Sequence, residues 1–236
     1  FVNATTFGLF VAEQVVELDG SITSNPLSWL KGITSKFGDP VLREAIKKGM
    51  EILSEEFVSG IDIEDALEKF DQPKLPCSFD MLGEAARTQS DVDFFFSAYE
   101  NAIKKVGEKN AFLSESFHEI SIKLSAIHPR YELLKKDRVM GELYERVLEL
   151  SYQAANQGIA LTIDAEEQDR LELSLLLIEK LAKEKQLSDW NGLGLAIQAY
   201  GKRSPNIVGF VDSLGQKRNG IMMRLVKGAY WDQEIK

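Results

Sequence analysis

The sequence predicts an α/β fold, a (β/α)8 barrel of which about five strands are present, preceded by an all-helical arm. Three observations support this prediction. After Pro76, short apolar segments alternate with amphipathic helical segments, as parallel strands joined by crossover helices require. Each apolar segment ends in polar or charged residues. No glycine-rich dinucleotide turn or phosphate-binding loop follows the first strand, which disfavours a Rossmann or P-loop protein.

The N-terminal part has the pattern of a helical arm. An Asp-Pro pair at 39–40 predicts a helix start, and apolar residues then recur at helical spacing until Gly60. A second short helix is expected over 62–70, and the segment DQPKLP that follows is a proline-punctuated linker. We therefore divide the chain into a helical arm with its linker (1–72) and the N-terminal part of a barrel (73–236).

The barrel part contains five expected strands in chain order. Each is a short apolar segment bounded by polar or turn-forming residues. Their ranges are 77–85, 119–127, 160–166, 193–200 and 221–228.

Helices are expected between these strands. Ser90 is the predicted cap of the first helix, with Asp93 as its partner three residues on, and Ser204-Pro205 opens the fourth. Two helices have apolar stripes at helical spacing, and the first of these ends at Gly158. The stripes are Val139, Leu143, Val147, Leu150 and Ala154 in one, and Leu171, Leu175, Ile178 and Ala182 in the other.

Polar residues end every predicted strand. They are Asp80 and Glu84, Lys123 and Ser125, Asp164 and Glu166, Gln198 and Tyr200, and Arg224 and Lys227. In a (β/α) barrel the active site lies at the C-terminal ends of the strands, so all five ends would meet at one site. An open doubly wound sheet needs such ends only where its strand order reverses. The pattern therefore favours the barrel.

Composition excludes several classes of function. The net charge of -9 comes without a cluster of Lys and Arg, which argues against nucleic-acid binding by this segment. The only cysteine, Cys77, excludes an internal disulfide, and with two histidines it supplies too few ligands for us to expect a metal site. The apolar start of the chain meets Glu13, Glu17 and Asp19 within one helix length, so it is neither a membrane span nor a signal peptide.

The segment IMMRLVKGAYWDQEIK at 221–236 is the most informative for chemistry. Arg224, Lys227, Tyr230 and Trp231 gather around the end of an apolar strand. Cations can meet phosphate or developing negative charge, and aromatic rings can cover a flat ring system. This combination favours a planar, anionic cofactor.

Five segments, DMLGEA, SIKLSAIHPRYE, IDAEEQDRLE, QAYGKRSP and MRLVKGAYWDQEIK, together resemble the proline dehydrogenase domain of the proline utilization A (PutA) family, bifunctional flavoenzymes of bacteria. The resemblance covers roughly residues 57–236, and the helical residues before them resemble the family's arm. It implies a barrel that binds FAD and oxidises L-proline to Δ1-pyrroline-5-carboxylate by hydride transfer to flavin N5, the first step of proline catabolism to glutamate. It also implies electron transfer to a membrane quinone and an aldehyde dehydrogenase domain outside this chain. The implied location is cytoplasmic, with peripheral contact at the inner face of the bacterial membrane.

The resemblance also implies roles for cofactor-binding residues. Arg224 matches an arginine beside flavin N5, where a fixed guanidinium stabilises negative charge that arrives with hydride. Gln198 and Asp164 match partners for the polar edge of the flavin. Val226, Lys227, Gly228 and Ala229 match the family's loop that runs along the bound FAD. Trp231 matches an aromatic residue that packs on the cofactor.

A second group matches the substrate side of the family's active site. Lys123 resembles a lysine that helps to hold the proline carboxylate, and Asp164 would orient it. Tyr230 resembles a residue that shields the substrate, and Glu84 would add negative charge to the same network. Arg224, Lys123 and Asp164 are the expected catalytic residues.

The chain departs from the family pattern in one respect. The family holds the proline carboxylate with two adjacent arginines in the last barrel helix, and this chain has no Arg-Arg pair. Strands six to eight are also absent from the pattern. We therefore expect a piece of a longer protein that by itself binds FAD poorly and turns over no proline.

Three alternatives stay open. A methylenetetrahydrofolate reductase-like flavin barrel would share the polar strand ends. A Schiff-base aldolase would use Lys123 or Lys227 as its nucleophile. A non-catalytic piece would contribute only folding or assembly surface. The oligomeric state, including a homo-oligomer, is open as well.

Overall fold

The computed structural model describes residues 43, 47, 58–69, 76–110 and 118–231. The chain separates into two compact units, residues 1–69 and 70–236. In the first unit, helix α3 (Ile63–Lys69) follows Asp62, whose side chain accepts a hydrogen bond of 2.9 Å from the backbone amide of Asp65. The short helix expected here is thereby confirmed. The helix expected to start at 39–40 lies mostly outside the described residues, and the division after residue 72 stays a prediction.

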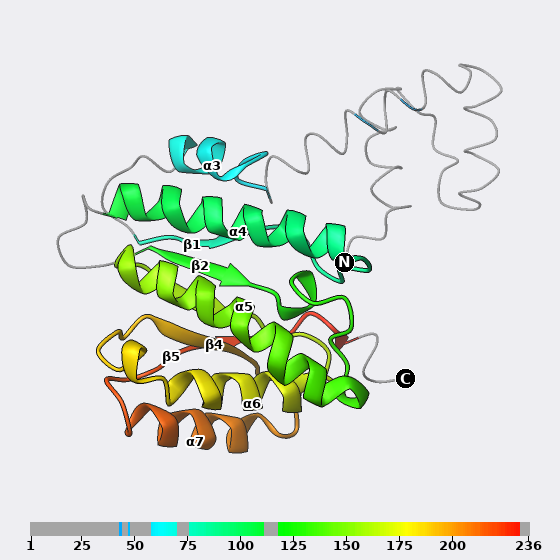
Figure 1. Ribbon diagram of the computed structural model, residues 1–236, viewed down its shortest axis with the longest axis vertical. Coiled ribbons are helices and arrows are strands. Elements are labelled where there is room, and N and C mark those ends of the chain that lie inside the picture. Colours follow the sequence, from blue (N-terminus) through cyan, green and yellow to red (C-terminus); the bar gives the residue numbers. More distant parts are fainter. Residues whose placement is uncertain (1–42, 44–46, 48–57, 70–75, 111–117, 232–236) are drawn as a thin grey trace, which may run out of the picture. The chain divides into compact units, whose positions relative to one another are not determined.

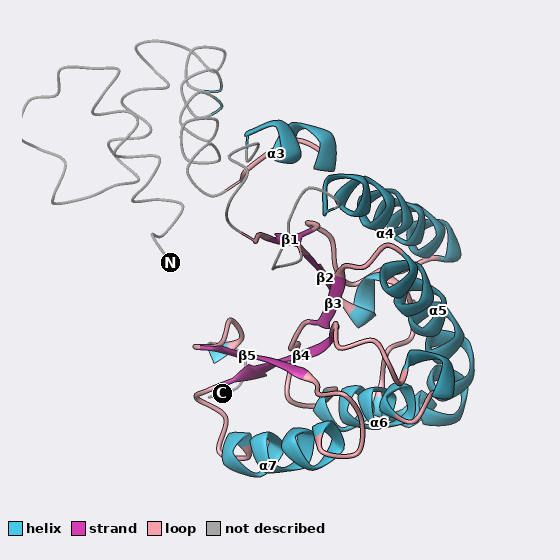
Figure 2. Ribbon diagram, turned by 90° about the vertical axis from the view of Figure 1, so that its left-hand side faces the viewer, coloured by secondary structure: helices cyan, strands magenta, loops and turns pink. Residues whose placement is uncertain are grey.

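The second unit is built on one five-stranded parallel sheet in the order β1-β2-β3-β4-β5. The strands are β1 (Ser78–Asp80), β2 (Glu119–Ile122), β3 (Ala160–Ile163), β4 (Leu193–Gln198) and β5 (Met222–Val226). Figure 2 shows that the sheet curves and that the long helices of this unit lie on its outer side. Because the strand order never reverses, the sheet is not doubly wound. It is a half-barrel, which confirms the predicted fold class.

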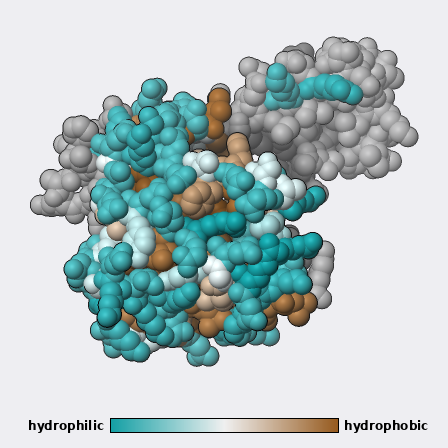
Figure 3. Space-filling view, viewed as in Figure 1, coloured by the Kyte–Doolittle hydropathy of each residue, from teal (hydrophilic) through white to brown (hydrophobic). Residues whose placement is uncertain are grey.

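Four long helices cover the convex face of the sheet, side by side in chain order (Figure 1). They are α4 (Gln89–Asn110), α5 (Lys136–Asn156), α6 (Leu171–Ala182) and α7 (Ser204–Gly215). Short 3-10 helices occur at η1 (Leu124–Ala126), η2 (Leu133–Lys135) and η3 (Lys185–Leu187). The outward side of this helix layer is mostly hydrophilic (Figure 3).

The core lies between the sheet and the helices. Branched aliphatic side chains of the central strands are fully buried, among them Ile120, Ile122, Leu161 and Ile163 at 0% exposure. The predicted stripe of α5 from Val139 to Ala154 is buried as well and is confirmed. Burying this apolar area is the main stabilisation of the unit.

The cap of α4 differs from the prediction. The hydroxyl of Thr88 accepts the backbone amide of Asp91 at 3.2 Å, and the Asp91 carboxylate accepts the amide of Thr88 at 2.9 Å. These reciprocal bonds form a capping box two residues before the expected one, and Ser90 lies inside the helix. The predicted pair of Ser90 and Asp93 is wrong because the same residue spacing occurs twice in TQSDVD.

The predicted stripe of α6 is also mostly wrong. Its fully buried leucines are Leu173, Leu177 and Leu181, together with Ile178 from the predicted set. The other predicted positions are only half-buried, and they are Leu171, Leu175 and Ala182. Leucine occurs on several sides of LELSLLLIEKLA, so spacing alone does not identify the buried side.

The strands end earlier than the apolar pattern predicts. β1 ends at Asp80, and the backbone then turns through Gly83, at φ 150°, and Ala85, at φ 55°. A Cβ atom on Gly83 would lie 2.2 Å from the Phe95 ring, so the turn requires glycine. After β2 the chain enters η1, which is buried yet not extended. These early turns bring the loops together at the C-terminal ends of the strands.

No described helix has both the length and the apolar composition needed to cross a bilayer. Within the same described ranges, no group of three or more His, Cys, Asp and Glu side chains is arranged around a metal-sized space.

Candidate active site

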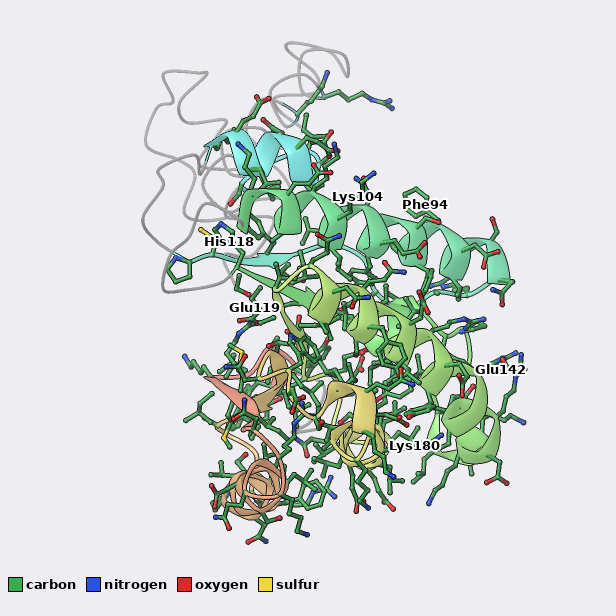
Figure 4. The ribbon with its side chains drawn as sticks, turned by 60° about the vertical axis from the view of Figure 1, so that its left-hand side comes forward. Phe94, Lys104, His118, Glu119, Glu142 and Lys180 are labelled. Carbon is green, nitrogen blue, oxygen red and sulfur yellow. The ribbon has the colours of Figure 1, made fainter. Side chains whose placement is uncertain are left out.

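Arg224 on β5 reaches across the concave face of the sheet. Its Nη1 donates to Ser121 Oγ at 2.8 Å and lies 3.4 Å from Asp164 Oδ1. Its Nη2 donates to Ser78 Oγ and forms an ion pair with Glu119. Figure 4 shows Glu119 projecting from β2 on the side that faces β5. These contacts place polar side chains of β1, β2 and β5, and Asp164 directly after β3, on one shared face.

Lys123 follows β2 and lies between two carboxylates. Its Nζ is 2.7 Å from Asp80 Oδ1 and 2.9 Å from Asp164 Oδ2. Its backbone amide donates to the hydroxyl of the buried Tyr99 on α4 at 3.0 Å, which fixes the end of the strand. The cation therefore has a fixed position on the concave face.

The charges of this cluster shift its pKa values. Burial acts to lower the pKa of Lys123, but hydrogen bonds to Asp80 and Asp164 outweigh it and raise that pKa above its usual value. Burial raises the pKa of Asp164, against the opposing effect of Lys123. Lys123 is therefore a permanent cation at neutral pH.

Gln198 ends β4 and is buried at the rim of the sheet. Its Nε2 donates to the Glu166 carbonyl at 3.0 Å, while its Oε1 accepts the Tyr200 hydroxyl at 3.1 Å and the Ala229 amide at 3.2 Å. Both the nitrogen and the oxygen of the Gln198 side-chain amide are thus hydrogen-bonded within the protein. Gln198 is bonded to residues of the rim, whereas Lys123 is bonded to Asp80 and Asp164 in the ion-pair cluster.

The turn after β5 packs on Tyr200. Gly228 has φ 118°, and a Cβ atom there would lie only 1.8 Å from the Tyr200 ring. Trp231 meets the same ring edge-on, with centroids 5.5 Å apart, and 52% of Trp231 is exposed. The Val226 carbonyl accepts the Ala199 amide at 2.7 Å, and Lys227 is exposed beside it. Glycine is thus required by the aromatic ring beneath the turn.

Tyr230 and Glu84 join the loops of the first and last strands. The Tyr230 hydroxyl donates to Glu84 Oε2 at 3.2 Å. Burial raises the pKa of Tyr230, and the nearby Glu84 charge adds to this rise. Two residues predicted for the substrate side are therefore in contact.

The structure brings most predicted site residues together. Lys123, Asp164 and Arg224 form one network, and Glu84 pairs with Tyr230. The remaining predicted residues line the adjoining rim, and they are Gln198, Val226, Lys227, Gly228, Ala229 and Trp231. Their roles toward substrate or cofactor stay predictions.

Sequence reasoning missed three residues that hold Arg224, namely Ser78, Glu119 and Ser121. Asp80, which holds Lys123, is among the predicted polar strand ends. The signal was present as a period of two, because SFD and EISIK alternate polar and apolar residues. Such alternation predicts one polar face and one buried face for each strand.

A parallel half-barrel with charged residues gathered on its concave face defines part of a (β/α)-barrel enzyme. Residues 63–236 match the proline dehydrogenase family, so the chain belongs to that family.

Curated relatives agree with this assignment. The chain is 44% identical over 243 residues to the bifunctional protein PutA of Salmonella typhimurium and 43% identical to that of Escherichia coli K12. Each alignment covers 100% of this chain and 18% of the relative, so the chain spans less than a fifth of their length. The resemblance to the PutA family is thereby confirmed.

Solved structures show the same fold. A crystal structure of Bradyrhizobium japonicum PutA matches with a TM-score of 0.73 and 39% identity, over 98% of this chain and 24% of that one. PutA from Bdellovibrio bacteriovorus matches with a TM-score of 0.77 over 98% of this chain and 25% of that one, at 21% identity, which supports the fold alone.

Proposed function

We propose that the protein carrying this chain is an FAD-dependent L-proline dehydrogenase, and that these residues supply the first five strands of its active site. The observation that carries the proposal is the network of Lys123, Asp164 and Arg224 on the concave face of a proline dehydrogenase family member. The product would be Δ1-pyrroline-5-carboxylate, with a membrane quinone as electron acceptor. An aldehyde dehydrogenase region elsewhere in the protein is supported by relatives that are named bifunctional and are much longer than this chain.

The chemistry of the donor set fits a flavin. Arg224 and Lys123 are fixed cations on the concave face, which suit an acceptor that gains negative charge. Trp231 offers a half-exposed flat ring, and Lys227 offers an exposed cation for phosphate. Bound FAD would supply the acceptor for hydride from the ring carbon next to the proline nitrogen, and the nitrogen would release its protons as the C=N bond of the product forms.

Lys123 would bind the proline carboxylate. An ammonium group has three donors, and two of them face Asp80 and Asp164 among the described residues. The third is left for a substrate carboxylate. Because the two carboxylates hold Lys123 in place, little side-chain freedom is lost when substrate binds.

Arg224 would stabilise negative charge that develops during the reaction. Its guanidinium is held by Glu119, Asp164 and two serine hydroxyls, so it needs no reorganisation at the moment of reaction. Tyr230 and Glu84 would wall the substrate side and limit the entry of water.

The Schiff-base alternative is disfavoured by the charge of Lys123. An attacking amine must be neutral, whereas the two carboxylates raise the pKa of Lys123. Lys227 is exposed, whereas a lysine that forms a Schiff base lies in an enclosed, apolar pocket.

The test is flavin reduction without oxygen in the whole protein that carries this chain. We expect L-proline to bleach the flavin absorption and NADH to leave it unchanged. Bleaching by NADH alone would support the folate reductase alternative. Lysine trapping by borohydride with a keto substrate, in a protein without flavin absorption, would support an aldolase. A lack of all three reactions would support a non-catalytic piece.

A further inference from the structure

Hydrogen bonds join the loops at the C-terminal ends of all five strands into a closed ring. The β1 and β2 loops meet at Ser125, whose Oγ accepts the Ala85 amide at 3.0 Å and whose carbonyl accepts the Ala86 amide at 2.9 Å. The β2 loop then meets the β3 loop, because the Ser125 amide donates to Glu166 Oε1 at 3.0 Å. Three of the five loops are thus linked.

The other two loops complete the ring. Gln198 at the end of β4 donates to the Glu166 carbonyl at 3.0 Å and accepts the Ala229 amide, after β5, at 3.2 Å. Tyr230, the next residue, donates to Glu84 in the β1 loop at 3.2 Å. The path therefore returns to its start even though the sheet itself is open between β5 and β1.

Glu166 is the residue on which most of this ring depends. It accepts Ser125 with its side chain and Gln198 with its backbone, so it links three consecutive loops. It is 8% exposed, and Arg170 Nη1 lies 2.9 Å from its Oε2 and supplies a counter-charge. A buried carboxylate whose two oxygens both have partners is held in one low-energy position. It in turn holds those partners in place.

We infer that Glu166 is a positioning residue that fixes the rim of the site through Ser125 and Gln198, and thereby holds Tyr230 against Glu84. Its effect reaches Lys123 as well, because Ser125 lies in η1 directly after that lysine. The part of this inference that concerns substrate rests on the proposed function. The ring of hydrogen bonds does not.

The neighbouring Glu167 provides a matched control. It also lies near Arg170, with Oε2 at 3.2 Å from Nη1, but it makes no bond in the ring. Glu166→Ala and Glu167→Ala therefore each remove one carboxylate beside the same arginine. Only the first removes an acceptor for another loop.

The test is amide hydrogen–deuterium exchange in the whole protein that carries this chain, resolved for Ser125 and Ala229. Glu166→Ala is expected to speed exchange more than about tenfold at Ser125, whose amide loses a charged acceptor, and to speed exchange at Ala229 as well, because Gln198 is then held less firmly. Glu167→Ala is expected to leave both unchanged. Faster exchange at Ser125 alone would mean a merely local role and would overturn the inference.

Two further variants cover the case in which Glu166→Ala does not fold. Glu166→Gln keeps an acceptor for Ser125 and should restore slow exchange there. Ser125→Ala removes the acceptor of the Ala85 amide and should speed exchange at Ala85. Unchanged exchange in Ser125→Ala, or fast exchange at Ser125 in Glu166→Gln, would contradict the ring.

Activity then separates this inference from the proposed function. Glu166→Ala should raise the KM for proline more than it lowers kcat, because it loosens the substrate wall and leaves Arg224 in place, whereas Glu166→Gln should keep both close to the wild-type values. A kcat that falls with an unchanged KM would contradict positioning of the wall. If the wild-type protein oxidises no proline, the proposed function fails, whereas the exchange results still decide whether the ring exists.

Discussion

The two faces of one curved sheet differ in chemistry. The convex face presents residues such as Ile120, Ile122 and Leu161, which are fully buried under helices. The concave face presents Lys123, Arg224 and their acidic and hydroxyl partners. The residues of both faces alternate along the same strands. One face thus forms the core and the other carries the candidate site, within the same five strands.

The largest expected effect separates the two faces by stability. Leu161→Ala opens a cavity in the convex core and should lower the free energy of unfolding by about 2–5 kcal/mol. Ser121→Ala on the concave face removes one hydroxyl acceptor of Arg224 and should cost only about 1 kcal/mol. Urea unfolding of both variants measures the difference. Equal losses would show that the concave face also supports the core.

The next prediction concerns catalysis. Arg224→Met should slow flavin reduction by proline about 10²–10³-fold, as expected for loss of a fixed group that stabilises developing charge. Stopped-flow reduction measures the rate, and thermal unfolding measures how far folding is impaired. Glu119→Gln, which keeps the guanidinium and neutralises one partner, is the control and should change the rate less. Equal reduction rates in wild type and Arg224→Met would remove the role given to Arg224.

Substitution of two glycines by alanine, one in the turn after β5 and one in helix α5, should change stability in opposite directions. Gly228→Ala places a methyl group in the Tyr200 ring at a positive φ and should cost about 1–3 kcal/mol of stability. Gly141→Ala in α5 meets no atom within 4 Å and should stabilise by about 0.5–1 kcal/mol. Thermal unfolding of the two variants would show opposite signs. A neutral Gly228→Ala would mean that the turn after β5 is not held by Tyr200.

The smallest effect is a pH dependence at the rim. Burial raises the pKa of Glu166 in the folded state, so the folded protein binds a proton at pH values where the unfolded chain has released it. The free energy of unfolding should therefore fall as pH rises from the unfolded pKa to the folded pKa. Glu166→Gln removes this contribution. Urea unfolding between about pH 4 and pH 7 should show a smaller decline in the variant than in the wild type. An equal decline would assign the effect to another group.

The sequence predicts the fold well because its signals are local. Alternation of strands and helices needs no knowledge of distant contacts, and the charged strand ends identify Lys123, Asp164 and Arg224 in advance. The partners of Arg224 are harder to predict because Ser78 and Glu119 are 146 and 105 residues away in sequence. Only the curvature of the sheet brings them together.

Strand lengths were predicted poorly for a different physical reason. The apolar run after Lys123 continues the hydrophobic pattern of β2, but it is buried as a 3-10 helix. The spacing of apolar residues indicates which positions are buried, but it does not indicate the backbone conformation at a turn. The pattern therefore predicts Ser125 and Glu166 as strand ends but does not predict the hydrogen bond between them.

Neighbours along the chain are also neighbours in the sheet, from β1 to β5. Each strand and its helix can therefore pack against strands that precede them in the chain. This is also the order in which the ribosome synthesises them. The contacts of Ser78 with Arg224 and of Glu84 with Tyr230 each span 146 residues and are the last to become available. Assembly of this half-barrel would thus be complete, and its charged face aligned, only when the fifth strand has emerged.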